Sequence, residues 1–189
     1  MLEAGSDHFA IQPIVAVGPR AGVPHSESSG RRVRPGEGVF LELGASIRRY
    51  TAPVMRTVAC GAPHPDLLVL ADLCTRSVEA AVRMMHPGCP ASAVAEAANQ
   101  VVVEGGGSIL FHGYFGYPVG VSFPPSWLEN LDYHLTLDNE APLEEGMVFH
   151  LPISLRRRGE RGVGLSYTVA VTSGGGEVLT GTPASLILE

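Results

Sequence analysis

The chain has 189 residues, of which 45% are hydrophobic, so it is large enough to form one globular domain around a buried core. Its formal net charge of -6 provides no basic surface for phosphates, which excludes DNA- and RNA-binding proteins as a class. The first residues lack the bases of a signal peptide, and no run approaches 18 apolar residues. We therefore expect a soluble cytoplasmic protein with no membrane partner. Its three cysteines fit neither a disulfide framework nor a zinc site, and we expect reduced, mostly buried thiols.

The first third of the chain is predicted to contain strands separated by polar loops. Residues 11–17 are apolar and rich in β-branched side chains, and the glycine and proline that follow indicate a loop, which carries His25. Residues 38–44 predict a buried strand with one acid inside it. The segment 48–59 contains Pro53, which cannot donate to a sheet, so we expect an edge position, a bulge or a strand break there.

The middle of the chain is predicted to form a helical hairpin. Pro65 and Asp66 suit the first turn of a helix, and apolar residues at three- and four-residue steps continue it to about Met85. A second helix is predicted from Ala91 to about Val103, because three consecutive glycines follow it. The apolar stripe of the first helix is assigned to the core.

The last third is predicted to be an irregular loop followed by strands. Residues 111–127 are rich in glycine, proline and aromatic side chains, which favours a shaped loop over a regular strand. The three arginines at 156–158 are expected to form a solvated turn. The predicted strands are residues 147–155, 164–172 and 177–180, with a hairpin turn at 173–176.

Four segments, in the same order and spacing, resemble the creatinase/aminopeptidase P family (peptidase family M24). They are Pro13–Gly18 with His25, Arg56-Thr57 after Tyr50, Leu143–Phe149, and Val171-Thr172 with Gly176–Thr180. The resemblance implies an α+β, pita-bread fold, with two helix pairs over a curved antiparallel sheet. Family members normally carry an N-terminal domain and opening helices. We therefore expect residues 1–189 to be a single catalytic domain that lacks both, and to form a homodimer or a complex with a chain that supplies the missing region.

The same resemblance implies that the metal site of the family has been lost. Peptidases of this family hold two divalent ions with two Asp, one His and two Glu side chains. The matching positions here are Glu42, Pro53, Tyr117, Pro152 and Ser166, and Pro124 falls near a second, non-ligand histidine. One possible ligand out of five cannot hold a metal pair, so we expect neither a metal nor another cofactor.

The local sequence is closer to metal-free, ectoine hydrolase-like members of the family, which open a cyclic amidine. The similar segments are Glu42–Ala45, Arg49-Tyr50, Arg56–Val58, Gly116–Gly120, Pro124–Trp127 and Phe149–Leu151. This similarity implies metal-independent hydrolysis of a C–N bond in a small cyclic amidine, amide or amino-acid derivative. The acid that these enzymes carry in their penultimate strand is replaced by Tyr167, so one carboxylate is missing.

His25 and Glu42 are the catalytic candidates. Histidine titrates near neutral pH, and a glycine-rich loop can direct it into a pocket, although a surface-loop histidine is the alternative. Burial in an apolar strand would disfavour the charged form of Glu42, which suits either a proton donor or a carboxylate nucleophile. A structural acid paired with Arg49 or Arg56 is the rival interpretation.

Five further residues are assigned to binding a small polar or zwitterionic substrate: Arg56, Tyr117, Trp127, His150 and Tyr167. Arg56 suits a carboxylate clamp or a brace for the sheet. Tyr117 and Trp127 suit the walls of a pocket for a cationic ring, or ordinary aromatic packing. His150, inside a strand, suits a pocket wall or the core.

Two other hypotheses stay open. The lost ligands are also expected of a catalytically inactive, truncated paralogue that serves as a binding or partner subunit. A metal-dependent Xaa-Pro aminopeptidase is the remaining alternative, and it would require bound metal. His112 and His134 have no ligand-like partner in the sequence and are assigned no role.

Overall fold

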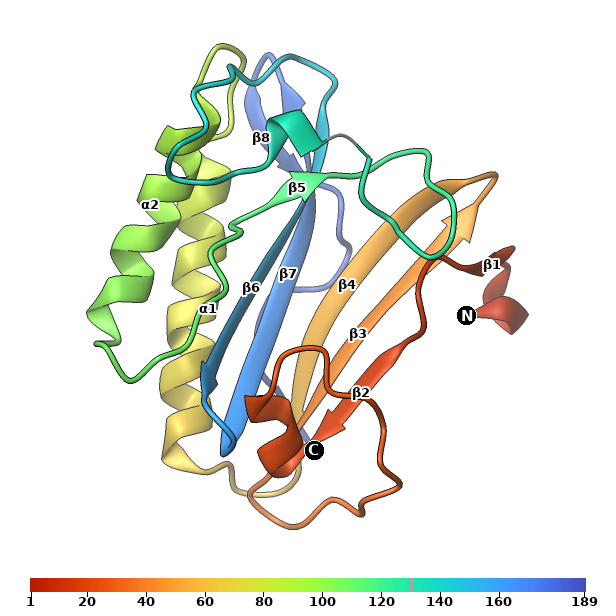
Figure 1. The fold of residues 1–189 in the computed structure, drawn as a ribbon, viewed down its shortest axis with the longest axis vertical. Coiled ribbons are helices and arrows are strands. Elements are labelled where there is room, and N and C mark those ends of the chain that lie inside the picture. Colours follow the sequence, from red (N-terminus) through yellow and green to blue (C-terminus); the bar gives the residue numbers. More distant parts are fainter. Residues whose placement is uncertain (130) are drawn as a thin grey trace.

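The computed structural model describes residues 1–129 and 131–189, which form two antiparallel sheets and a helical hairpin (Figure 1). The helices are α1 (Pro65–Met84) and α2 (Ala91–Glu104), with short 3-10 helices η1 (Leu2–Ala4), η2 (Gly18–Gly22) and η3 (Leu131–Tyr133). The strands are β1 (His8–Phe9), β2 (Ile14–Val17), β3 (Gly38–Ile47), β4 (Tyr50–Ala59), β5 (Tyr117–Pro118), β6 (Val148–Arg157), β7 (Arg161–Thr172), β8 (Gly175–Val178) and β9 (Ile187–Leu188).

The two sheets join along one edge. One has the order β1-β3-β4-β9 with β2 also paired to β3, and the other has the order β5-β6-β7-β8. Strand β4 lies along β7 (Figure 1), and hydrogen bonds that involve side chains join the two strands there in place of a regular backbone ladder. The Met55 N–H donates to Ser166 Oγ at 2.7 Å, and the Gly164 N–H donates to Thr57 Oγ1 at 3.0 Å. The sheets therefore form one curved layer, the α+β pita-bread arrangement implied by the resemblance.

This junction explains why Pro53 is tolerated inside β4. Alternate residues of a strand direct their N–H groups to the same edge, so the nitrogen of Pro53 faces the same side as the Met55 N–H, toward β7. No ladder bond to β3 is lost, and β4 runs through Pro53 without a break. Of the three possibilities that proline raised, the edge position is confirmed.

The helical hairpin covers one face of β6 and β7 (Figure 1). Its first helix begins after His64, whose Nδ1 accepts a hydrogen bond from the Asp66 N–H at 3.2 Å. Alternate residues of β6 enter the same core as the helix residues Leu70 and Val78; they are Phe149, Leu151, Ile153 and Leu155. Both predicted helices are confirmed to within one residue, because their apolar faces meet a sheet face of matching period.

Several details differ from the predictions, among them the start of β7 at Arg161 and not at residue 164. Strand β2 begins at Ile14, after Pro13, and not at residue 11. Strand β8 begins at Gly175, because Gly175 already pairs with Thr172 and only residues 173–174 form the turn. The described residues contain one helix pair where the resemblance implied two. The cysteines are free and two of the three are buried, as predicted. In the described part of the chain, no helix combines the length and the apolar character needed to cross a membrane.

Candidate active site

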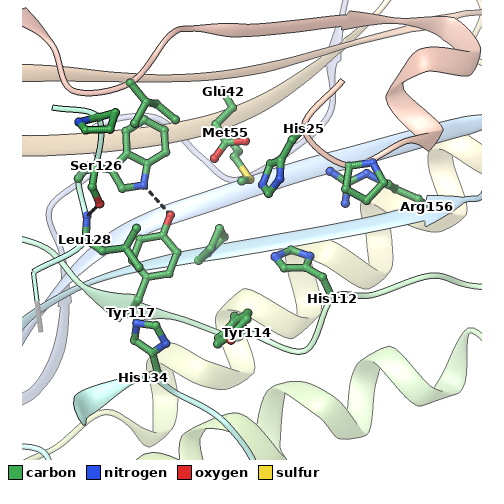
Figure 2. Close-up of a pocket in the computed structure, with 15 residues that line it drawn as sticks. His25, Glu42, Met55, His112, Tyr114, Tyr117, Ser126, Leu128, His134 and Arg156 are labelled. Atoms are coloured by element: carbon green, nitrogen blue, oxygen red, sulfur yellow. Dashed lines mark hydrogen bonds between the residues drawn. The ribbon is translucent and has the colours of Figure 1, made fainter. Parts of the chain in front are cut away.

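A cavity of about 400 Å³ opens on the face of the curved sheet that the helices leave uncovered. Its walls come from β3, β4 and β6, from the loop after η2, and from the long segment between α2 and β6. Figure 2 shows side chains from these elements converging on one space. The lining residues are Ile11, Pro24, His25, Glu42, Met55, His112, Tyr114, Tyr117, Pro125, Ser126, Trp127, Leu128, His134, Pro152 and Arg156.

His25 lies in the loop that follows η2 and points into the cavity beside Glu42 (Figure 2). Its φ angle of 51° is in the left-handed region, which a residue with a side chain seldom adopts. The preceding 3-10 helix is attached to the sheet, since the carbonyl oxygen of Ala21 accepts a hydrogen bond from Arg156 Nε at 3.2 Å. The loop is thus held at its base while the imidazole faces the cavity.

Glu42 is placed in the cavity by the alternation of β3. Phe40, Glu42 and Gly44 share one face of the strand, and Glu42 is 5% exposed. Within the described residues its carboxyl group has no hydrogen-bond or ion-pair partner. Burial raises the pKa of Glu42 to about 7, although the positive charge of Arg156 opposes this shift. At neutral pH the carboxyl group therefore exchanges readily between its protonated and ionised forms.

Tyr117, Trp127 and His150 form a hydrogen-bonded group at the other end of the cavity. Trp127 Nε1–H donates to the Tyr117 hydroxyl oxygen at 2.9 Å, and His150 Nδ1 lies 2.9 Å from the same oxygen. The indole packs over Gly44, where a Cβ atom would lie 2.8 Å from Trp127 Cε3. Burial lowers the pKa of His150 to about 3, so this imidazole is neutral. Tyr117 and Trp127 line the cavity, whereas His150 lies behind Tyr117 and supports it.

Arg156 also lines the cavity, which corrects the prediction of a solvated turn at residues 156–158. It is 5% exposed, lies inside β6, and its guanidinium carbon is 5.2 Å from the centre of the Phe40 ring. The strand extends further than predicted because Arg156 and Arg157 still pair with β7, and Leu110 also pairs with Arg156. The alternation that places Pro152 on the cavity face puts Arg156 there too, a signal that the charged run concealed.

Two histidines without a predicted role are cavity residues as well. His112 faces the same space as His25 and Arg156 (Figure 2), and burial together with these two groups lowers its pKa to about 4. His134 lies near Tyr114, with ring centres 5.2 Å apart, and burial lowers its pKa. Both sit on the segment between α2 and β6, whose path depends on long-range pairing and not on local sequence.

Arg56 and Tyr167, both assigned to substrate binding, do not line this cavity. Arg56 follows Met55 in β4 and therefore points to the opposite face, where Nη1 donates to the carbonyl oxygens of Met55 and Ser166 at 2.6 and 2.8 Å. It braces the sheet junction, which was the alternative interpretation. Tyr167 points to the helix side, and its hydroxyl oxygen accepts the Ala184 N–H at 3.0 Å.

The described residues do not fit a divalent metal pair. In residues 1–129 and 131–189, no three His, Cys, Asp or Glu side chains are arranged to hold a metal ion. Of the five positions that the resemblance assigns to the family's ligands, Glu42 alone carries a carboxylate. Pro53 directs its carbonyl oxygen to Thr168 Oγ1 at 3.4 Å, and Ser166 Oγ accepts the Met55 N–H. Tyr117 Oη is occupied by Trp127 and His150. The polar atoms near these five positions thus serve the fold.

Comparison with known proteins finds relatives along almost the whole chain. The chain is similar to the ectoine hydrolase of Halomonas elongata, with 30% identity over 189 residues, covering 98% of this chain and 46% of the relative. It is also 27% identical over 183 residues to the Xaa-Pro dipeptidase of Pyrococcus horikoshii, covering 97% of this chain and 50% of that one. The chain thus spans about half the length of these relatives.

Solved structures share the fold. A prolidase from Thermococcus sibiricus superimposes with a TM-score of 0.89 at 29% identity, covering 99% of this chain and 49% of that chain. An X-Pro aminopeptidase from Thermotoga maritima also gives a TM-score of 0.89, at 23% identity, over 100% of this chain and 52% of that one. The sequence profile of metallopeptidase family M24 matches residues 1–173, and the chain therefore belongs to this family.

Proposed function

We propose that the chain carries the catalytic site of a metal-independent hydrolase that cleaves a C–N bond in a small cyclic amidine, amide or amino-acid derivative. The observation that carries the proposal is Glu42, a buried carboxyl group with a pKa of about 7, which faces a cavity that also contains His25. A carboxyl group that titrates near neutral pH can donate a proton to a leaving nitrogen and be reprotonated afterwards. The similarity to an ectoine hydrolase supports the same reaction class.

The lack of a fitting ligand set supports metal independence. A metal pair would activate water and polarise the carbonyl or amidine carbon, and it needs bridging carboxylates. Glu42 is the sole carboxylate among the described residues that line the cavity. The side chains available for activating water are therefore imidazoles, and His25 is the one that lies beside Glu42 in Figure 2.

The proposed step is a general acid–base hydrolysis. A water molecule attacks the amide or amidine carbon, and His25 takes the proton that this water loses. The C–N bond then breaks, and the leaving nitrogen takes the proton of Glu42. His25 carries one proton more and Glu42 one fewer at the end, and exchange with solvent restores both. Tyr117 and Trp127 enclose the planar part of the substrate.

Replacement of the carboxyl group tests this role. In Glu42→Gln, turnover of ectoine, followed by NMR as ring opening, should fall by about 100-fold or more, because the amide cannot donate an acid proton. The urea midpoint should not fall, since the amide has nearly the same shape. Glu79→Gln, on the exposed face of α1, is the matched control and should retain activity. Wild-type turnover by Glu42→Gln would remove Glu42 from the mechanism.

An inactive binding subunit is the second candidate, and the single cavity carboxylate favours it. On this alternative, the wild-type chain would bind ectoine or creatine without hydrolysing either compound. The same NMR experiment separates the two candidates, because it reports line broadening on binding and new resonances on hydrolysis. Binding without products, under conditions in which the chain is folded, would favour the subunit role.

A further inference from the structure

The two buried arginines of the sheet have different partners. Arg56 is 8% exposed and its two terminal nitrogens donate to the carbonyl oxygens of Met55, Ser166 and Thr182, and to Thr182 Oγ1. Arg156 is 5% exposed, and among the described residues only its Nε donates a hydrogen bond, to Ala21. The terminal nitrogens of Arg56 thus all have protein acceptors, although its Nε is buried without one, whereas the terminal nitrogens of Arg156 have no acceptor among the described residues.

The free fork faces the cavity. Arg156 lines it beside His25 and His112 (Figure 2), and no carboxylate of the described residues lies within ion-pair distance of it. The Phe40 ring covers one side of the guanidinium group, whose carbon lies 5.2 Å from the ring centre. A buried charge is costly unless it is paired, and a guanidinium fork matches a carboxylate in geometry and charge.

The charges that line the cavity are unevenly distributed. Arg156, His25 and His112 gather at one end, while Tyr117 lies at the other (Figure 2). Trp127, which lines the same cavity, donates a hydrogen bond to Tyr117 and belongs to that end. Glu42 lies between these two ends. A ligand that fits both ends carries a negative group on one side and a planar or apolar group on the other, with its central bond opposite Glu42.

We propose that the terminal nitrogens of Arg156 form a carboxylate subsite, which selects amide or amidine acids over their neutral analogues. The position of the scissile bond opposite Glu42 depends on the function proposed above. The existence of the carboxylate subsite does not depend on that function. Arg156 is a specificity-determining residue on this proposal, and His112 adds a donor at the same end of the cavity.

A matched pair of probes tests the subsite by binding alone. N-acetylglycine and N-acetylglycinamide differ in whether the terminal group is a carboxylate or an amide, and both can be titrated into the 189-residue chain by calorimetry. We expect N-acetylglycine to bind about tenfold more tightly or better, as for a charge-assisted hydrogen bond. Equal affinities, no measurable binding of either probe, or tighter binding of inorganic phosphate would overturn the assignment to a carboxylate.

Variants of Arg156 then test whether this residue causes the preference for the carboxylate probe. Arg156→Gln should remove it, while Arg158→Gln, the same change at an exposed arginine two residues away, should leave it intact. Arg156→Lys keeps the charge but loses the fork, and it should weaken N-acetylglycine binding by about tenfold. This second variant decides the matter if Arg156→Gln does not fold. An undiminished preference in either folded Arg156 variant would overturn the proposal.

The outcome is separable from the proposed reaction. Hydrolysis of N-acetylglycine would appear as free acetate in the NMR spectrum of the same samples. A carboxylate preference that depends on Arg156, without any acetate, would support the subsite while counting against hydrolysis of this amide. Hydrolysis of both probes at equal rates, together with equal affinities, would support the proposed hydrolysis and overturn the carboxylate subsite.

Discussion

Glu42 carries a carboxyl group, which is most stable in water when ionised, but β3 places this group in an apolar cavity wall. Its neighbours on the same face are Phe40, which is covered by Arg156, and Gly44, which is covered by Trp127. The resulting desolvation raises the pKa of Glu42 to about 7. The same burial that makes the group useful as an acid must therefore destabilise the folded state when the group is ionised.

The pH dependence of stability follows from this shift. The folded-state pKa is about 7 against an ordinary value of 4.5, so the folded chain binds the proton more tightly than the unfolded chain. Stability from this group is fully present below pH 4.5 and is lost as the pH rises through 7. Between pH 4.5 and 8 the wild type should lose about 3 kcal/mol of unfolding free energy relative to Glu42→Gln.

Urea unfolding of both proteins across this range provides the measurement. Other carboxyl groups titrate alike in the two proteins, so the difference isolates Glu42. Glu79→Gln, at an exposed site, should differ from the wild type by a pH-independent amount. Parallel stability curves for the wild type and Glu42→Gln would show that Glu42 has no raised pKa.

At the scale of elements, η2 links the loop that carries His25 to the sheet. Gly162 in β7 lies directly under this 3-10 helix, and a Cβ atom there would collide with the carbonyl oxygen of Ala21 and crowd Arg156. The carbonyl of Ala21 is also the acceptor of the Arg156 Nε–H. One close contact between two backbones therefore positions both His25, four residues further on, and the free fork of Arg156.

Gly162→Ala should separate η2 from β7. We expect a loss of about 1–3 kcal/mol of unfolding free energy from overpacking, together with weaker binding of N-acetylglycine, because the loop and the guanidinium group both shift. Thermal unfolding and calorimetry measure the two effects. Gly107→Ala is the matched control, since a Cβ atom there meets open space. Equal stability of the two variants would mean that η2 adjusts without cost.

The elements differ in how far the sequence predicts them. Both helices follow from local periodicity, a proline at the start and glycines at the end, and their limits are correct within one residue. Three consecutive arginines suggest solvent, but the pairing of β6 with β7 continues through Arg156 and Arg157 and places Arg156 in a buried strand. The parallel pairing of β9 with β4 joins residues far apart in sequence, and no local pattern predicts it.

At the scale of the whole molecule, the sequence predicts well which segments come together around the cavity. It predicts less well which side chains of these segments point into the cavity. His25, Glu42, Tyr117 and Trp127 come from three separate segments and line one cavity, as the resemblance implied. Arg56 and Tyr167 belong to the correct strands but to the opposite faces. A one-residue difference along a strand moves a side chain across the sheet, so a segment match cannot settle its direction.

The curved sheet should be stable without divalent metal. Its junction between β4 and β7 relies on side-chain hydrogen bonds from Ser166, Thr57 and Arg56, and Ser166 stands at a position that the resemblance assigns to a metal ligand. A metal bound at 100 times its Kd would stabilise the folded chain by about 2.7 kcal/mol, equivalent to a rise in Tm of roughly 5–10 °C. We therefore expect Mn²⁺ or Co²⁺, added to protein dialysed against EDTA, to leave both Tm and turnover unchanged.

Elemental analysis of the untreated protein should find less than one metal ion per chain, and N-acetylglycine serves as the positive control for stabilisation by a ligand. A stoichiometric metal whose removal lowers Tm and abolishes turnover would return the chain to the metal-dependent peptidases.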